Sequence, residues 1–222
     1  MTGLAALLLD LDGTLAHSLP AMFHSYREFL GRYGRSGSER EFEHLNGPTL
    51  ATIVGTLADR HGLADSTETL LAAYRAILED NYPRLVKPRA GADLLLAYAE
   101  SRSLRIGLVT SSMRRIAESF LSAYRLSGYF STIVAAEDVD LGKPDPLSYR
   151  RALEVLGVPP AAALAVEDSR AGALASTAAG IRTIFLKSGT STPPVSPLVI
   201  ACAVDLHEVR ERLHVEVECG EC

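Results

Sequence analysis

Residues 4–15 read LAALLLDLDGTL, a continuous apolar run that stops at two aspartates and a glycine. A run of this length without polar alternation predicts a strand that is buried on both faces of a parallel sheet. In an extended strand end, spacing by two directs Asp10 and Asp12 the same way, and Gly13 permits a tight turn beneath them. Ligands bind at the carboxyl ends of the strands in open parallel sheets. The stretch therefore predicts a first core strand with two carboxylates at its ligand-binding end.

Similar apolar runs recur along the chain, and helical patterns lie between them. The runs span residues 106–109, 133–136, 163–166 and 183–186. The helical patterns span residues 92–101, 112–127, 146–156 and 169–179. This alternation predicts an α/β fold with a Rossmann-like, doubly wound parallel sheet and helices on both of its faces.

The region between about residues 17 and 84 breaks this rhythm, because it contains no convincing buried strand. Amphipathic helical patterns fill it instead, at residues 21–33, 49–61 and 67–82. Clusters of glycine, proline and serine separate these patterns. We interpret residues 16–87 as an all-helical cap domain inserted after the first strand, with residues 1–15 and 88–222 forming the core.

Size and charge exclude several classes of protein. The 222 residues suffice for one sizeable core and a smaller accessory unit. The formal charge is −5 and nothing indicates a basic face, so we expect no nucleic-acid partner. The early apolar run is far shorter than a membrane span, and no basic segment precedes it. We expect a cytoplasmic protein without membrane attachment.

The three cysteines do not form a disulfide framework for a domain of this size, which agrees with a reducing compartment. Cys219 and Cys222 form a Cys-x-x-Cys pair near the C-terminus. We interpret the pair as part of a frayed end, with a metal or redox role as the alternative.

Polar side chains follow three later strands, at the points where those strands are expected to end. Thr110 and Ser111 offer hydroxyls at a helix N-terminus, where phosphate oxygens bind, although helix capping is the alternative. Lys143 lies in a Gly-Lys-Pro loop that aims one ammonium group at a phosphate, unless it is a surface lysine in a turn. Glu167 and Asp168 add carboxylates, with capping as the alternative for Asp168.

The paired acids indicate a metal site. Two carboxylates as close as those of Asp10 and Asp12 repel one another unless they share a cation or a proton. A hard divalent ion with oxygen ligands relieves this repulsion. The second acidic pair adds oxygen ligands from the opposite side of the same crevice. The four strand ends together predict a site for a divalent ion and a phosphate group.

In this order the motifs resemble those of the haloacid dehalogenase superfamily, in its branch of phosphoglycolate phosphatase and β-phosphoglucomutase relatives. The resemblance covers nearly the whole chain, because the inserted helical region looks like the helical cap of that superfamily. It implies that Asp10 is the nucleophile and forms an aspartyl-phosphate, while Asp12 acts first as acid and then as base. It also implies that Thr110, Ser111 and Lys143 hold the phosphoryl group.

The same resemblance implies Mg²⁺ as the cofactor. Its ligands are then Asp10, the backbone carbonyl of Asp12, and Asp168, with Glu167 assisting directly or through water. His17 departs from the family pattern, in which an acid commonly follows at that place. We assign His17 to the substrate-binding residues, with a structural role as the alternative.

The activity implied by the resemblance is that of a Mg²⁺-dependent phosphatase that acts on a small phosphorylated metabolite. We expect the protein to be a monomer or a homodimer. The presence of Asp12 disfavours the dehalogenating and phosphonate-cleaving members. A β-phosphoglucomutase-like sugar-phosphate mutase is the main alternative, and Thr14 modestly disfavours it. A non-catalytic module that binds a phosphometabolite is the second alternative.

Overall fold

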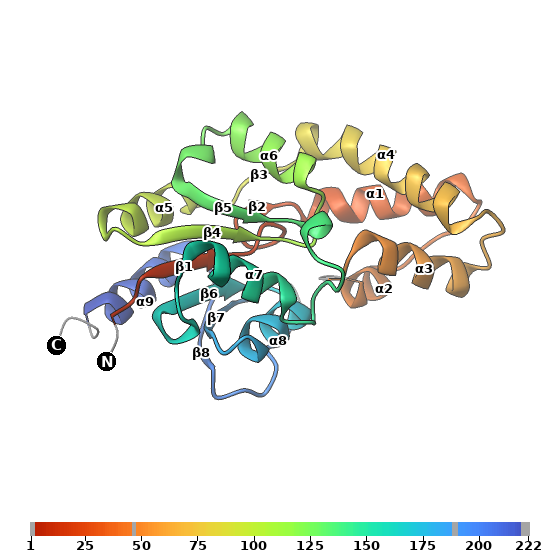
Figure 1. Ribbon diagram of the computed structural model, residues 1–222. Coiled ribbons are helices and arrows are strands. Elements are labelled where there is room, and N and C mark those ends of the chain that lie inside the picture. The colour runs from red at the N-terminus through yellow and green to blue at the C-terminus, as the bar shows by residue number, and fades with distance from the viewer. Residues whose placement is uncertain (1–2, 46–47, 188–190, 219–222) are drawn as a thin grey trace.

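The computed structural model describes residues 3–45, 48–187 and 191–218. Its core is a six-stranded parallel sheet in the order β5-β4-β1-β6-β7-β8 (Figure 1). The strands of this sheet are β1 (Ala6–Leu9), β4 (Arg105–Val109), β5 (Phe130–Val134), β6 (Ala163–Glu167), β7 (Arg182–Leu186) and β8 (Val199–Ala203). β1 lies between β4 and β6, so Leu8 pairs with Gly107 on one side and Ala165 on the other.

Helices cover both faces of this sheet. They are α5 (Ala92–Ser101), α6 (Arg114–Ala123), α7 (Leu147–Leu156), α8 (Arg170–Ala178) and α9 (Leu206–Glu218). Three short 3₁₀ turns in the described core connect the elements: η1 (Ser127–Tyr129), η2 (Ala136–Asp138) and η3 (Pro160–Ala162). Leu7 and Leu9 are buried with α5, α6 and α9, whereas Ala6 and Leu8 are buried with α7 and α8. Because strand side chains alternate between faces, this division confirms the predicted doubly wound α/β fold.

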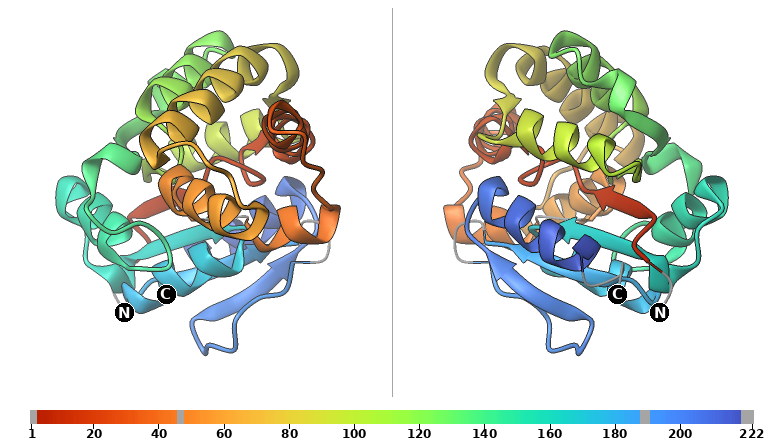
Figure 2. Two further views of the ribbon diagram at one scale, coloured as in Figure 1. Left: turned by 90° about the vertical axis from the view of Figure 1, so that its right-hand side faces the viewer. Right: turned by 90° about the vertical axis from the view of Figure 1, so that its left-hand side faces the viewer.

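A helical module lies between two short strands, β2 (Ala16–His17) and β3 (Lys87–Pro88), which pair antiparallel. Its helices are α1 (Leu19–Arg32), α2 (Glu39–His44), α3 (Leu50–His61) and α4 (Thr67–Leu85). They lie together on the right in Figure 1, and Figure 2 shows them from that side, in front of the sheet. α4 packs on α1 and α3, and Phe29 stacks on Tyr74 with ring centroids 4.6 Å apart.

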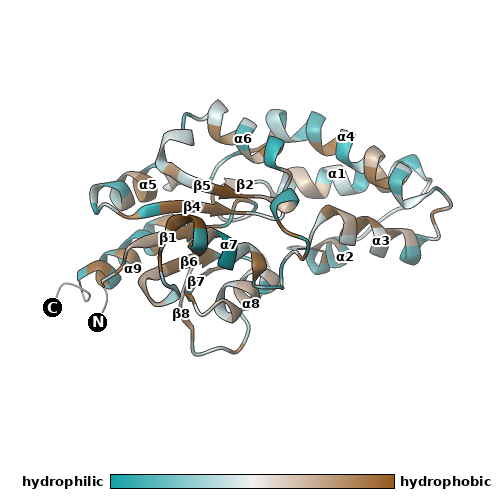
Figure 3. Cartoon of the chain, viewed as in Figure 1, coloured by the Kyte–Doolittle hydropathy of each residue, from teal (hydrophilic) through white to brown (hydrophobic). Residues whose placement is uncertain are grey.

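Local sequence sets where the helices of the module begin. The hydroxyls of Ser38, Thr49 and Ser66 accept hydrogen bonds from backbone N–H groups in the first turns of α2, α3 and α4. Each cap satisfies a donor that the helix itself leaves unpaired. Gly62 ends α3 in the left-handed conformation, with a φ of +60°. The module is amphipathic, whereas the central strands are mainly hydrophobic (Figure 3).

Several elements differ from the prediction. β5 begins at Phe130 rather than Ile133, because its first residues are partly exposed and do not form an apolar run. β8, followed by α9, is an edge strand in which partly buried and exposed residues alternate, so it lacks the predicted pattern of a core strand. The short helix α2 has no buried residue that would indicate a helix in the sequence.

Cys219 and Cys222 lie outside the described residues. Within those residues, no helix combines the length and apolarity that a membrane span needs.

Candidate active site

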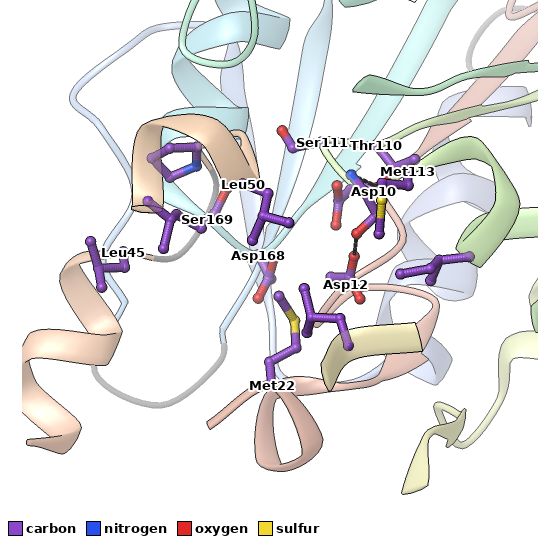
Figure 4. Close-up of a pocket in the computed structure, with 15 residues that line it drawn as sticks. Asp10, Asp12, Met22, Leu45, Leu50, Thr110, Ser111, Met113, Asp168 and Ser169 are labelled. Carbon is purple, nitrogen blue, oxygen red and sulfur yellow. Dashed lines mark hydrogen bonds between the residues drawn. The ribbon is translucent and has the colours of Figure 1, made fainter. Parts of the chain in front are cut away.

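Loops from three neighbouring strands converge on one pocket at the carboxyl ends of the sheet (Figure 4). Asp10 follows β1, Thr110 and Ser111 follow β4, and Asp168 follows β6. Together with Asp12 they line a cavity of about 60 Å³. Because β4, β1 and β6 are adjacent, residues that are far apart in the chain share this cavity.

A cluster of buried carboxylates forms the floor of the site. Asp10, Glu167 and Asp168 are at most 6% exposed, and each offers an oxygen within 4.8 Å of the others. Burial raises the pKa of Asp10 from 3.8 to about 8, against the opposing effect of Lys143. Burial and the neighbouring carboxylates also raise the pKa of Asp168 well above its usual range. Oxygen-rich, electronegative clusters of this kind are suited to a hard divalent cation.

Lys143 lies behind Asp10 and ties the cluster together. Its ammonium nitrogen donates hydrogen bonds to Asp10 Oδ1 at 2.7 Å, to the Val109 carbonyl at 2.9 Å, and to Glu167 Oε1 at 2.5 Å. Burial acts to lower the pKa of Lys143, but the two carboxylates outweigh it and raise that pKa above its ordinary value. The lysine is therefore a permanent positive charge, and one ammonium group faces a cluster of three carboxylates.

Glu167 is held by groups that the sequence analysis did not identify. The hydroxyl of Tyr149, on α7, donates to Glu167 Oε1 at 2.6 Å. A Cβ atom on Gly172 would lie 2.0 Å from Glu167 Oε2, so only glycine fits at this position of α8. Nothing in the sequence indicates that Tyr149 contributes a hydroxyl to the site, because its spacing on α7 is that of an ordinary core residue.

Asp12 is held from both sides of the module–core boundary. The hydroxyl of Tyr82, near the end of α4, donates to Asp12 Oδ1 at 2.8 Å. The hydroxyl of Ser112, after β4, donates to Asp12 Oδ2. Burial raises the pKa of Tyr82 well above its usual range, so its phenol stays protonated as a donor. Two fixed donors orient the Asp12 carboxylate within the pocket, and Tyr82 joins the module to the site.

Backbone geometry places Asp168 against the first loop. Gly13 has a φ of +88°, and a Cβ atom there would lie 2.0 Å from Asp168 Oδ2. The capping alternative for Asp168 is wrong, because Ser169 is the N-cap of α8 and accepts from the Gly172 N–H at 3.0 Å. The carboxylate of Asp168 is thus directed to the pocket rather than to the helix.

Replacing Gly13 with alanine is expected to displace Asp168, because the new methyl group occupies the position of its carboxylate. We expect activity to fall roughly 100-fold, the usual cost of about 1 Å of misplacement in a site. The matched control is Gly34→Ala, where φ is +65° and no atom lies within 4 Å of the added Cβ. Both variants lose about 1–2 kcal/mol from left-handed strain, measured by denaturant unfolding. Equal activity losses in the two would contradict this account.

His17 does not join the other predicted site residues. Ala16 is buried and His17 is exposed, because successive side chains of β2 point in opposite directions. His17 lines a neighbouring cleft of about 860 Å³ with Arg89 and Arg170, whereas Asp10, Asp12 and Thr110 do not line that cleft. Its assignment to substrate binding therefore lacks geometric support in this structure.

Comparison with known proteins agrees with this geometry. The family model described as haloacid dehalogenase-like hydrolase matches residues 7–186. Validoxylamine A 7'-phosphate phosphatase of Streptomyces hygroscopicus subsp. limoneus is 32% identical over 91% of this chain and 94% of its own length. Fructose-1-phosphate phosphatase YqaB of Escherichia coli is 31% identical over 82% of this chain and 96% of its own length. The crystal structure of CbbY from Rhodobacter sphaeroides in complex with phosphate shares the fold, with a TM-score of 0.82, 24% identity, and coverage of 93% of this chain and 96% of that one. The predicted resemblance is confirmed, and the chain belongs to the haloacid dehalogenase-like hydrolase family.

Proposed function

We propose that the protein is a Mg²⁺-dependent phosphatase that hydrolyses a small phosphate monoester through an aspartyl-phosphate on Asp10. The observation that carries the proposal is that Asp10, Asp12 and Asp168 line one pocket, beside the hydroxyls of Thr110 and Ser111. Relatives of this family that are named as phosphatases support hydrolysis as the reaction. A carboxylate nucleophile, an acid–base group and phosphate-binding hydroxyls are the parts that phosphoryl transfer requires.

The proposed reaction has two steps. A carboxylate oxygen of Asp10 attacks phosphorus, the bond from phosphorus to the ester oxygen breaks, and Asp12 donates a proton to the departing alcohol. Water then attacks phosphorus, Asp12 takes a proton from it, and the bond from phosphorus to Asp10 breaks. Inorganic phosphate leaves, and both aspartates return to their starting states.

The other residues of the site position these groups. Thr110 and Ser111 bind oxygens of the phosphoryl group, and Lys143 holds Asp10 in place by its 2.7 Å hydrogen bond. The donor set fits Mg²⁺, because the buried cluster offers carboxylate oxygens close together. Asp10, the carbonyl of Asp12, and Asp168 would hold the ion, with Glu167 assisting. When bound, Mg²⁺ supplies positive charge that keeps Asp10 ionised and neutralises the phosphoryl oxygens.

The helical module would serve as a cap. Residues 16–87 form this proposed cap domain, and residues 1–15 and 88–222 form the catalytic core. Closure of the module over the pocket excludes water until the alcohol has left. We place the enzyme in the cytoplasm, acting on a small phosphorylated metabolite.

A panel of phosphate esters tests the proposed function. We expect release of inorganic phosphate with Mg²⁺, none with a chelator, and inhibition by Ca²⁺, whose larger and looser coordination misplaces the nucleophile. A bisphosphorylated sugar in the same panel separates hydrolysis from mutase activity, because a mutase yields an isomerised sugar phosphate. Failure to release phosphate from any ester with Mg²⁺ present would contradict the proposal.

The raised pKa values predict how the stability of the metal-free protein depends on pH. Asp10 titrates at about 8 in the folded protein and at about 4 when unfolded, so the folded state holds more protons between these values. The free energy of unfolding therefore falls as pH rises from about 4 to 8. Thermal unfolding in chelator measures this decline, and Mg²⁺ is expected to reduce it by replacing the protons. The control is Asp10→Asn, in which the free energy of unfolding is expected to decline less over the same pH range. A metal-free protein that gains stability between about pH 4 and 8 would contradict the prediction.

A further inference from the structure

The pocket that holds Asp10 and Asp12 has two walls of opposite chemistry. The core supplies the polar wall, through the acids and hydroxyls that follow the strands. The helical module supplies the other wall. Among the described residues that line the pocket, the module contributes only apolar side chains: Met22, Leu45, Pro48, Leu50, Ile53 and Leu78.

The apolar wall lines the same pocket as Asp12, beside which the leaving group must lie. In the proposed reaction the ester oxygen takes its proton from Asp12, so the alcohol lies beside Asp12 and away from Asp10. Met113 and Ile116, from the loop before α6 and from α6 itself, extend the wall on the core side. Figure 4 shows Met22 and Leu50 reaching from the module into the pocket that Asp12 and Asp168 line.

This wall selects against hydroxylated alcohols. A hydroxyl group that leaves water and finds no hydrogen-bond partner loses free energy, and a site that recognises a polyol must present donors and acceptors to it. The module residues that line this pocket present methyl, methylene and thioether groups instead, and the hydroxyl of Tyr82 on α4 already donates to Asp12. The relatives named for fructose 1-phosphate and validoxylamine A 7'-phosphate carry the names of hydroxyl-rich alcohols, so the substrate class inferred for this chain differs from those in their names.

The size of the pocket limits the alcohol as well. A cavity of about 60 Å³ is far below the roughly 300–1,000 Å³ of pockets for larger ligands. The roomier cleft that contains His17, Arg89 and Arg170 shares Pro48 and Ser169 with this pocket, but neither Asp10 nor Asp12 lines it. A group bound there does not contact Asp10 or Asp12, so the carbon that bears the departing oxygen lies in the smaller pocket.

We propose that the substrate is the phosphate monoester of a small, apolar alcohol, such as a short alkyl alcohol, rather than a sugar or polyol phosphate. This inference rests on the proposed phosphatase function and specifies its substrate class. It assigns specificity to the apolar side chains of α1, α3 and α4, with Leu50 at the first position of α3.

Propyl phosphate and glycerol 3-phosphate form a matched pair for the test, because they have the same carbon chain and differ by two hydroxyl groups. With wild-type protein and Mg²⁺, we expect kcat/KM to be roughly 10- to 100-fold higher for propyl phosphate. Glycerol is the more acidic alcohol and leaves more easily, so a preference for propyl phosphate must come from the pocket. Equal values, or a preference for glycerol 3-phosphate, would overturn the inference.

A variant pair locates the preference in the wall. Leu50→Asn adds an amide to the pocket at a partly exposed position, and we expect the ratio of the two kcat/KM values to fall roughly two- to tenfold. The control is Leu94→Asn on α5, where the leucine is 47% exposed and does not line the pocket. An unchanged ratio in Leu50→Asn, with thermal stability like that of the control, would contradict the assignment to this wall.

Acetyl phosphate separates failure of this inference from failure of the proposed function. Its leaving group departs without a proton from Asp12 and is small enough to need no specific wall. If acetyl phosphate is hydrolysed in a reaction that requires Asp10 and glycerol 3-phosphate is the better ester, only the substrate class is wrong. The class is also wrong if acetyl phosphate is hydrolysed and neither three-carbon ester is. If neither acetyl phosphate nor any ester of the panel is hydrolysed, the phosphatase proposal fails with it.

Discussion

Asp10→Asn is expected to lower the rate of phosphate release by roughly 10⁴- to 10⁶-fold, the usual range for loss of a nucleophile. The amide has the shape of the carboxylate but cannot form the aspartyl-phosphate. Thr110, Ser111 and Asp168 keep their places around the pocket, so binding of a phosphate ester should survive in part. Steady-state release of phosphate, with substrate binding measured by calorimetry, checks both expectations.

The same substitution should not unfold the protein. Asp10 is buried beside Glu167 and Asp168, and its pKa is raised because the buried carboxylate is unfavourable there. A neutral side chain removes the cost of burying this charge and its repulsion from Glu167, so the melting temperature in chelator should be equal to or above that of the wild type. Asp59→Asn, an exposed change on α3, is the matched control. Near-normal activity in Asp10→Asn would remove Asp10 from the role of nucleophile.

Lys143→Met is expected to have the largest effect on stability. The lysine side chain is 2% exposed and donates to both Asp10 and Glu167, so its removal leaves buried carboxylates without their cation. Breaking a buried pair in this way costs about 3–5 kcal/mol. Denaturant unfolding measures the loss, and the control is Lys87→Met, at an exposed lysine of β3. A loss as small as that of the control would contradict the central place of Lys143.

A second substitution distinguishes loss of charge from loss of packing. Glu167→Gln removes one of the charges that Lys143 neutralises and keeps an oxygen that can accept from Tyr149. In the Lys143→Met background this change should therefore cost less than it does alone, and a double-mutant cycle measures the difference. Strictly additive losses would show that Lys143 contributes packing rather than charge. Activity is expected to stay low in the double variant, because Asp10 still lacks its 2.7 Å hydrogen bond.

The core of the fold follows closely from the sequence. The apolar run before Asp10 is too short and too uniform to be anything but a strand buried on both faces, and it became the inner strand β1. The edge strand β8 escaped prediction because one of its faces meets solvent, so its residues alternate. The short helix α2 escaped because its amphipathic signal is weak over six residues.

The residues of the site also divide into those that the sequence predicts and those that it does not. Residues that follow strands directly, such as Asp10 and Asp168, were predicted from position, since parallel strands end at one edge of the sheet. Tyr82 and Tyr149 were missed because each approaches the site from a helix, and only packing brings its hydroxyl to a carboxylate. His17 was included on its place at the junction with the helical region, and the pairing of β2 with β3 turns it outwards.

The measurement that tests the central claim most directly is identification of the phosphorylated residue. The protein with Mg²⁺ is mixed with acetyl phosphate, quenched in acid during turnover, digested and analysed by mass spectrometry. We predict one phosphoryl group on the peptide that contains Asp10, lost when the substrate is exhausted and absent from Asp10→Asn. A phosphoryl group on a different residue, or phosphate release with no covalent adduct at any time, would contradict the account.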